Sequence, residues 1–137
     1  MKVLQPAGWA APRGYANGVC ASGAQIFVAG QIGWNALCQF ESDDLVAQLR
    51  QALGNVVAVL AEAGATPQHI TRMTWYVTDK REYLARGKEI GAVFRDVIGS
   101  YSIAMTAVQV VALMEDRAKV EIEVTAVVGD RALSDKQ

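Results

Sequence analysis

The stretch Ile103–Val128 constrains the fold of this chain more than any other segment does. It contains two runs in which two sets of side chains alternate from one residue to the next. In the second run, apolar residues at every other position from Val120 onward are separated by polar ones, among them Glu121 and Glu123. A period of two is typical of a pleated strand with two different faces. The short charged connection Met114–Arg117 predicts that the two strands form a hairpin.

Two other segments predict amphipathic helices. Asp43–Ala63 carries leucines and valines at helical spacing, with Ser42 as the expected N-cap and Gly64 as the expected stop. Lys80–Ile98 has a similar apolar stripe behind the expected cap Asp79. Further strands are expected at Gly18–Ala21, Gln25–Ala29 and Ile70–Thr78, with an additional edge strand at Lys2–Gln5.

The resulting order, β-β-α-β-α-β-β, predicts a two-layer α+β sandwich in which two helices cover one face of a mixed sheet. The 137 residues are expected to form a single domain, 1–137, with an irregular N-terminal segment at 1–11 and a flexible tail at 130–137. The other face of the sheet would remain uncovered, and self-association is its simplest cover. We expect this face to carry Met105, Ala107, Gln109, Glu121 and Glu123.

Composition narrows the function classes. The chain is 20% charged with a net charge of −1, which gives no general attraction to nucleic acid or to anionic membranes. It lacks an apolar run long enough to span a bilayer and the continuous apolar core of a signal peptide, so a cytoplasmic location is expected. Cys20 and Cys38 are expected to be reduced. With His69 as the only histidine, neither a metal site nor a cofactor is expected.

Three places in the chain are candidates for chemistry. Glu121 is either a general acid/base or water-positioning carboxylate with a pKa raised by burial, or an interface carboxylate paired with Arg or Lys. Tyr15, between glycines, can offer its ring and hydroxyl to a pocket or serve as a packing aromatic. Gly30 and Gly33 indicate a bend or a close approach to the main chain, and Trp34 just after them can line a cleft.

The chain also resembles the RidA/YjgF family, once called the L-PSP endoribonuclease family. The resemblance is colinear over residues 12–128 and rests on RGYANG, VAGQI, the helix QLRQALGNVVAVLAEAGA, TWYVTD and VEIEVTAVV. It implies a chorismate-mutase-like α+β fold and a homotrimer with small-molecule clefts between subunits. It also implies hydrolysis of reactive enamines and imines, such as 2-aminoacrylate.

Residue by residue, the resemblance assigns roles to positions of this sequence. It places the water-positioning glutamate at Glu121 and a pocket-closing tyrosine at Tyr15. It places the bend, whose backbone carbonyl helps to position the water, at Ala29-Gly30-Gln31, and it implies that Gly30, Gln31 and Ile32 bind substrate. These assignments come from the family pattern, and the residues alone leave the role of Glu121 open.

The family's substrate-binding arginine has no counterpart here, because Met105 occupies its position and Ala107 follows two residues later. An arginine–carboxylate contact is charge-assisted and specific, whereas methionine offers only a soft apolar surface. A cleft with Met105, Ala107 and Trp34 is therefore expected to prefer a more apolar ligand, or one whose carboxylate is held elsewhere. Deamination of 2-aminoacrylate is expected to be weak or absent.

Three functions follow from these observations. The first is an imine or enamine hydrolase in which Glu121 activates water. The second is a non-catalytic trimer whose clefts hold a metabolite or present a surface to a protein. The third is RNA cleavage, which the balanced charge, the single histidine and the lack of a basic stripe disfavour.

Overall fold

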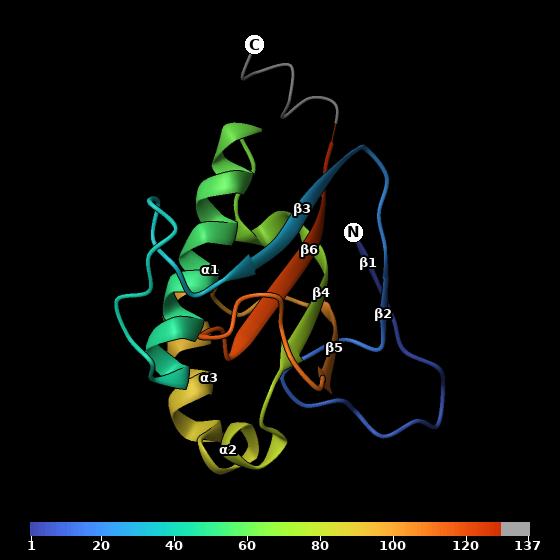
Figure 1. Cartoon of the computed structure of the whole chain (residues 1–137). Helices are drawn as coiled ribbons and strands as arrows, with labels where there is room; N and C mark the ends of the chain where they lie inside the picture. Colours follow the sequence, from blue (N-terminus) through green and yellow to red (C-terminus); the bar gives the residue numbers. More distant parts are fainter. Residues whose placement is uncertain (130–137) are drawn as a thin grey trace.

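A four-stranded mixed sheet organises the fold, in the order β3-β6-β4-β5 (Figure 1). Its strands are β3 (Ala24–Ile32), β6 (Val120–Val128), β4 (Ile70–Val77) and β5 (Ala104–Gln109). Strand β6 is antiparallel to both neighbours, whereas β4 and β5 are parallel. The computed structural model describes residues 1–129, so the tail expected at 130–137 lies outside the described part. The predicted mixed sheet is confirmed.

A separate two-stranded ribbon joins β1 (Lys2–Leu4) to β2 (Gly18–Cys20). The edge strand predicted at Lys2–Gln5 therefore exists, but it does not extend the main sheet. The chain between the two strands reaches β5 through Ala16, whose N–H donates to the carbonyl of Ile103 at 2.8 Å. This contact fixes the N-terminal segment against the edge of the main sheet.

The predicted hairpin between the last two strands is wrong. Strand β4 lies between β5 and β6 and pairs with both. The connection from β5 to β6 crosses the end of β4, where the N–H of Val110 donates to the carbonyl of Val77 and that of Thr78 donates to the carbonyl of Lys119. The alternating pattern predicts the faces of a strand, but it carries no information about which strands are neighbours.

The helices pack on one side of the sheet (Figure 1). Helix α1 (Leu45–Glu62) is capped by Asp44, whose carboxylate accepts from the N–H of Ala47, rather than by the predicted Ser42. The single second helix that was predicted is two helices, α2 (Lys80–Ala85) and α3 (Gly87–Val97), because the backbone turns at Arg86 before a glycine with low helix propensity. No helix within residues 1–129 is both long and apolar enough to cross a membrane.

The core lies between the helices and the inner face of the sheet. The apolar positions of β6 are buried as their alternation predicts: Val120, Ile122, Val124 and Ala126 are at most 3% exposed. Leu49 and Leu53 of α1 fill the space opposite them and are no more than 1% exposed. Burying such side chains supplies the main driving force for folding.

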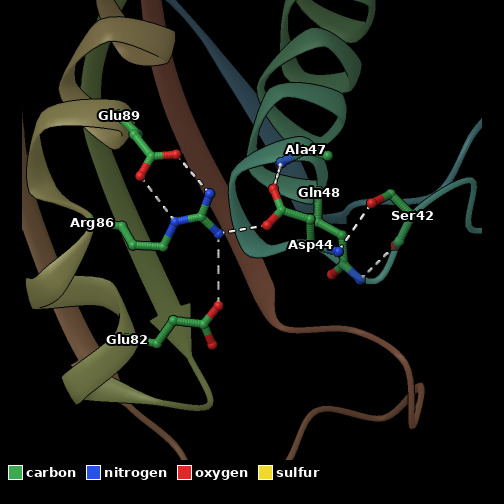
Figure 2. A network of polar contacts seen from close by, with 7 residues as sticks. All are labelled: Ser42, Asp44, Ala47, Gln48, Glu82, Arg86 and Glu89. Atoms are coloured by element: carbon green, nitrogen blue, oxygen red, sulfur yellow. Dashed lines mark hydrogen bonds and ion pairs between the residues drawn. The ribbon is translucent and has the colours of Figure 1, made fainter.

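Arg86, at the junction of α2 and α3, ties these helices to the start of α1 (Figure 2). Its guanidinium donates to Asp44 at 2.5 Å and to Glu89 at 2.6 Å, and it lies 3.8 Å from Glu82. The hydrogen bond from Arg86 lowers the pKa of Asp44 and of Glu89. Asp44 therefore both caps α1 and anchors Arg86.

Replacing Arg86 by methionine is expected to destabilise the protein at neutral pH but not in strong acid. A carboxyl whose pKa is lowered by folding adds stability above its unfolded value of about 4, and this contribution is lost as the pH falls through the lowered pKa. The urea midpoints of the wild type and Arg86→Met should differ at pH 7 and converge below about pH 4. Arg50→Met, which breaks an exposed pair with Asp96, is the matched control and should change little. A pH-independent gap for Arg86→Met would contradict the expectation.

Candidate functional site

The sheet separates the predicted site residues into two groups. Met105 is opposite Met73 of β4, whose side chain is fully buried under the helices. Thr106, in contrast, is opposite Thr74, which is opposite Glu123 on the uncovered face. Since directly opposite residues point to the same side of a sheet, Met105 lies on the helix side and Glu123 does not.

The prediction that Met105, Ala107 and Gln109 share a face with the carboxylates is therefore wrong. Ala107 is opposite the buried Trp75, and Gln109 accepts a hydrogen bond from the N–H of Lys80 at the start of α2. Both alternating sets on β5 mix small, apolar and polar residues, so their composition does not reveal which set faces the helices.

On the uncovered face, the carboxyl group of Glu121 lies over Gly30. A Cβ atom at Gly30 would stand 2.8 Å from Cδ and 3.0 Å from Oε1 of Glu121, so only glycine leaves room for this placement. The pairing of β3 with β6 shifts between Val28 and Gln31, which confirms the predicted bend. The half-buried Glu121 makes no hydrogen bond or ion pair with any residue in 1–129.

Glu123, one pleat away, has a structural partner. Tyr76 donates its hydroxyl proton to Glu123 at 2.5 Å, and this bond raises the pKa of the Tyr76 hydroxyl. The two residues line a shallow hollow of about 630 Å³ along the sheet, together with Arg72 and Phe27. Phe27 is 72% exposed there, so this face carries apolar as well as polar surface.

On the other side, Met105 and Tyr15 line a second hollow of about 650 Å³ between β5, the helices and the N-terminal segment. The bond of Ala16 to Ile103 brings Tyr15 to the start of β5. We call this hollow the aromatic cavity, because its wall includes Tyr15, Trp75, Tyr83, Phe94 and Tyr101. The structure therefore brings together two of the predicted site residues, Tyr15 and Met105.

Trp75 forms a buried part of this wall. It is 2% exposed and packs against Tyr83 and Phe94, with ring centroids 6.3 Å and 5.9 Å away. Its indole N–H has no hydrogen-bond partner in the described part of the chain. Burial also raises the pKa of the Tyr83 hydroxyl. The wall thus contains one buried hydrogen-bond donor without an acceptor in residues 1–129.

Arg95 is a residue of the cavity that the sequence reasoning missed. It follows Gly87 and Gly91 at intervals of four along α3, and all three line the aromatic cavity. Nη1 of Arg95 lies 3.2 Å from where a Cβ of Gly91 would stand, so the guanidinium occupies the room that this glycine leaves. Two glycines one turn apart in a helix are costly, and this spacing is the sequence signal that could have indicated a hollow here.

The remaining predicted residues have structural roles at the end of β3. Ile32, the strand partner of Glu121, is buried, and Trp34 packs on Phe40 with ring centroids 5.9 Å apart. Asn55 of α1 donates to the carbonyls of both Ile32 and Trp34, which gives the end of β3 a structural role. Gln31 donates to the carbonyl of Ala29 within the bend. No group of three potential metal ligands gathers anywhere in residues 1–129.

Comparison with known proteins gives a consistent result. The model of the family described as Endoribonuclease L-PSP matches residues 7–128. A RutC family protein of Aquifex aeolicus is 33% identical over 103 residues, 74% of this chain and 79% of that protein. A 2-iminobutanoate/2-iminopropanoate deaminase of Salmonella typhimurium is 31% identical over 105 residues, 77% of this chain and 80% of that protein.

Solved structures agree with this result. The Rid family protein YyfB of Yersinia pestis, of unknown function, superposes with a TM-score of 0.81 at 32% identity over 93% of this chain and 98% of that chain. The YjgF gene product of E. coli superposes with a TM-score of 0.66 at 30% identity over 93% and 98%. The α+β fold is thus the fold of the YjgF proteins. The chain belongs to the endoribonuclease L-PSP family, together with the RutC, Rid and YjgF proteins that it resembles.

Proposed function

We propose that this protein hydrolyses small reactive imines or enamines, with Glu121 positioning the attacking water, in clefts formed between subunits of a homotrimer. The observation that carries the proposal is the carboxylate of Glu121, which lies over Gly30 on the uncovered sheet face with no partner in residues 1–129. Relatives about one third identical carry the name 2-iminobutanoate/2-iminopropanoate deaminase, which supports the reaction class.

An interface between subunits would unite the two halves of the site. Within one chain, Glu121 lies on the uncovered face and the aromatic cavity on the helix side, so neither half is complete. The uncovered face also bears Phe27, which is 72% exposed, and burying it against another copy would be favourable. In a cyclic assembly, the uncovered face of one subunit meets a different surface of the next.

The chemistry needs only water and a positioned carboxylate. Glu121 takes a proton from water as the water oxygen bonds to the imine carbon, and the imine nitrogen takes a proton from the solvent to give a carbinolamine. The protonated Glu121 then gives its proton to the amino nitrogen, the carbon–nitrogen bond breaks, and the hydroxyl proton passes to the solvent. This leaves a carbonyl compound, ammonia and the Glu121 carboxylate. General-base assistance of this kind contributes about 10²–10⁴-fold to a rate.

A subunit-mixing experiment tests the proposal. Glu121→Gln removes the carboxylate, and Gly91→Trp fills the aromatic cavity, so each variant alone is expected to be inactive in ammonia release from imines. Coexpressed with different tags and purified as mixed trimers, the two should regain activity in about a third of their sites, since one of the three interfaces in each mixed trimer then joins two intact halves. Mixed oligomers no more active than their parents would contradict a shared site, and an inactive wild type would contradict the reaction.

Met105 favours one alternative function, a trimer that binds a metabolite without turning it over. The aromatic cavity has methionine at the position where the family resemblance expects the substrate-binding arginine. Calorimetric binding of a cavity ligand by a wild type that releases no ammonia from any imine would favour this alternative.

A further inference from the structure

We infer that the aromatic cavity accepts the side chain of an aromatic 2-imino acid, or of the matching 2-oxo acid, and that Arg95 of α3 binds its carboxylate. The inference names the substrate class of the proposed hydrolase and rests on that proposed function. It assigns the anion-binding role to a helix residue, because Met105 on the strand cannot fill it.

The placement of Arg95 supports this role. Its guanidinium lies in the room above Gly91, at the wall of the cavity. Within residues 1–129 it forms no ion pair, and neither do Arg13, Arg72 and Arg81, but of these four arginines Arg95 alone lines the aromatic cavity. A free planar guanidinium can bind a carboxylate through two parallel hydrogen bonds.

The charge of the cavity wall points to an anion. Among residues 1–129, Arg95 is the only charged residue that lines it, and no Asp or Glu does so. Arg95 is itself exposed, so solvent partly screens a charge pair formed here, and the pair depends on the two parallel hydrogen bonds of the guanidinium. A cationic ligand would meet the guanidinium without a compensating carboxylate.

The volume of the aromatic cavity and the residues of its wall favour a ligand with an aromatic ring. At about 650 Å³, the hollow is within the range of small-molecule sites and much larger than a pyruvate-sized compound needs. Trp75 is in edge contact with Tyr83 and in tilted contact with Phe94, an arrangement that a further ring can extend. Met105 adds a polarizable surface suited to a ring edge.

The indole N–H of Trp75 is a second, independent sign of a missing ligand. It is buried and has no acceptor in residues 1–129 although Trp75 lines the cavity. A buried donor without a partner costs about 1–3 kcal/mol. An acceptor on a bound molecule, such as the 2-oxo or 2-imino group, would relieve this cost.

Calorimetric titration of the intact oligomer with three probes tests the inference. Phenylpyruvate has the ring and the 2-oxo carboxylate, pyruvate has the 2-oxo carboxylate without the ring, and 2-phenylethanol has the ring without the 2-oxo carboxylate. We expect phenylpyruvate to bind at least about tenfold more tightly than either, since the contacts of both parts contribute. Pyruvate binding as tightly as phenylpyruvate would overturn the aromatic assignment.

Variants separate Arg95 from other arginines. Arg95→Met should weaken phenylpyruvate binding by about tenfold or more and leave 2-phenylethanol unchanged, and Arg95→Lys should fall between, because lysine keeps the charge but loses the planar fork. Arg81→Met, the same change on the exposed start of α2, is the matched control. Equal binding of phenylpyruvate to Arg95→Met and wild type would overturn the role of Arg95.

Turnover distinguishes this inference from the function on which it rests. Imines generated from L-phenylalanine or L-alanine by an amino-acid oxidase serve as substrates. The rate of ammonia release is measured for each imine, and the phenylalanine rate is divided by the alanine rate. The wild type should hydrolyse the phenylalanine imine faster than the alanine imine, whereas Arg95→Met should lower both rates, because both imines carry the carboxylate. Turnover of the phenylalanine imine no faster than that of the alanine imine, with both dependent on Glu121, would refute the substrate class alone. Arg95-dependent binding without turnover of any imine would refute the hydrolase alone.

Discussion

Replacing Glu121 by glutamine is expected to reduce imine hydrolysis by about 10²–10⁴-fold, the usual contribution of a positioned general base. Glutamine has nearly the same size and can still lie over Gly30, but its amide cannot accept a proton from water. Because Glu121 makes no hydrogen bond or ion pair within residues 1–129, the substitution should leave thermal stability nearly unchanged. Ammonia release under saturating imine, with a parallel melting curve, measures both effects.

Glu123→Gln is the matched control for this experiment. It makes the same chemical change two residues along β6, and its amide oxygen can still accept the hydroxyl of Tyr76. The rate of imine hydrolysis by Glu123→Gln should stay within a few-fold of the wild-type rate, since the carboxylate of Glu123 already accepts a hydrogen bond from Tyr76. Equal rates for the wild type and Glu121→Gln, or equal losses for the two variants, would remove the proposed role of Glu121.

Gly30→Ala tests whether the position of the Glu121 carboxylate matters for the rate. The new Cβ would stand 2.8 Å from Cδ of Glu121, so the end of this flexible side chain must move while the backbone can stay. The carboxylate would keep its chemistry and lose its position, and misplacement of a catalytic group by a fraction of an ångström reduces the rate. We therefore expect activity between those of the wild type and Glu121→Gln, with the fold retained.

The sequence predicts well those features that depend on one strand or one helix. Alternation along β6 correctly separates the buried Val120 and Ile122 from the carboxylates, because each strand position has a fixed side. The glycine at position 30 correctly indicates a bend and a close approach, since both follow from a missing Cβ. The two-layer α+β arrangement follows from the order of the elements.

The sequence did not predict features that depend on how the strands and helices are arranged relative to one another. Nothing in the residues of β5 indicates that β4 separates it from β6, so the hairpin prediction was wrong and placed Met105 on the wrong face. Arg95 was missed for a similar reason, because its importance arises only where α3 crosses the wall formed by Trp75 and Tyr15. A site formed by several strands and helices is hard to recognise from any one segment of the sequence. A site shared between subunits is harder still to recognise.

Gln48 shows how a single buried polar side chain holds the loops around the sheet. It is 1% exposed, its amide nitrogen donates to the carbonyls of Ser42 and Arg117 at 3.0 Å and 2.9 Å, and its oxygen accepts from the N–H of Lys119 at 2.8 Å. It thereby joins the start of α1 to the segment that leads into β6. A Cβ at Gly33 would stand 2.5 Å from Cβ of Gln48, so this close packing also requires the glycine.

Gln48→Ala is therefore expected to destabilise the fold by roughly 3–5 kcal/mol, since it leaves two carbonyls and one N–H without partners and opens a cavity. Urea unfolding at one fixed protein concentration measures the loss as a lower midpoint. Gln51→Ala on the same helix removes a single bond to the side chain of Asn55 and should cost less than about 1 kcal/mol. A similar midpoint for the two variants would mean that water enters and satisfies the groups around Gln48, and that the segment leading into β6 is held by its strand pairing alone.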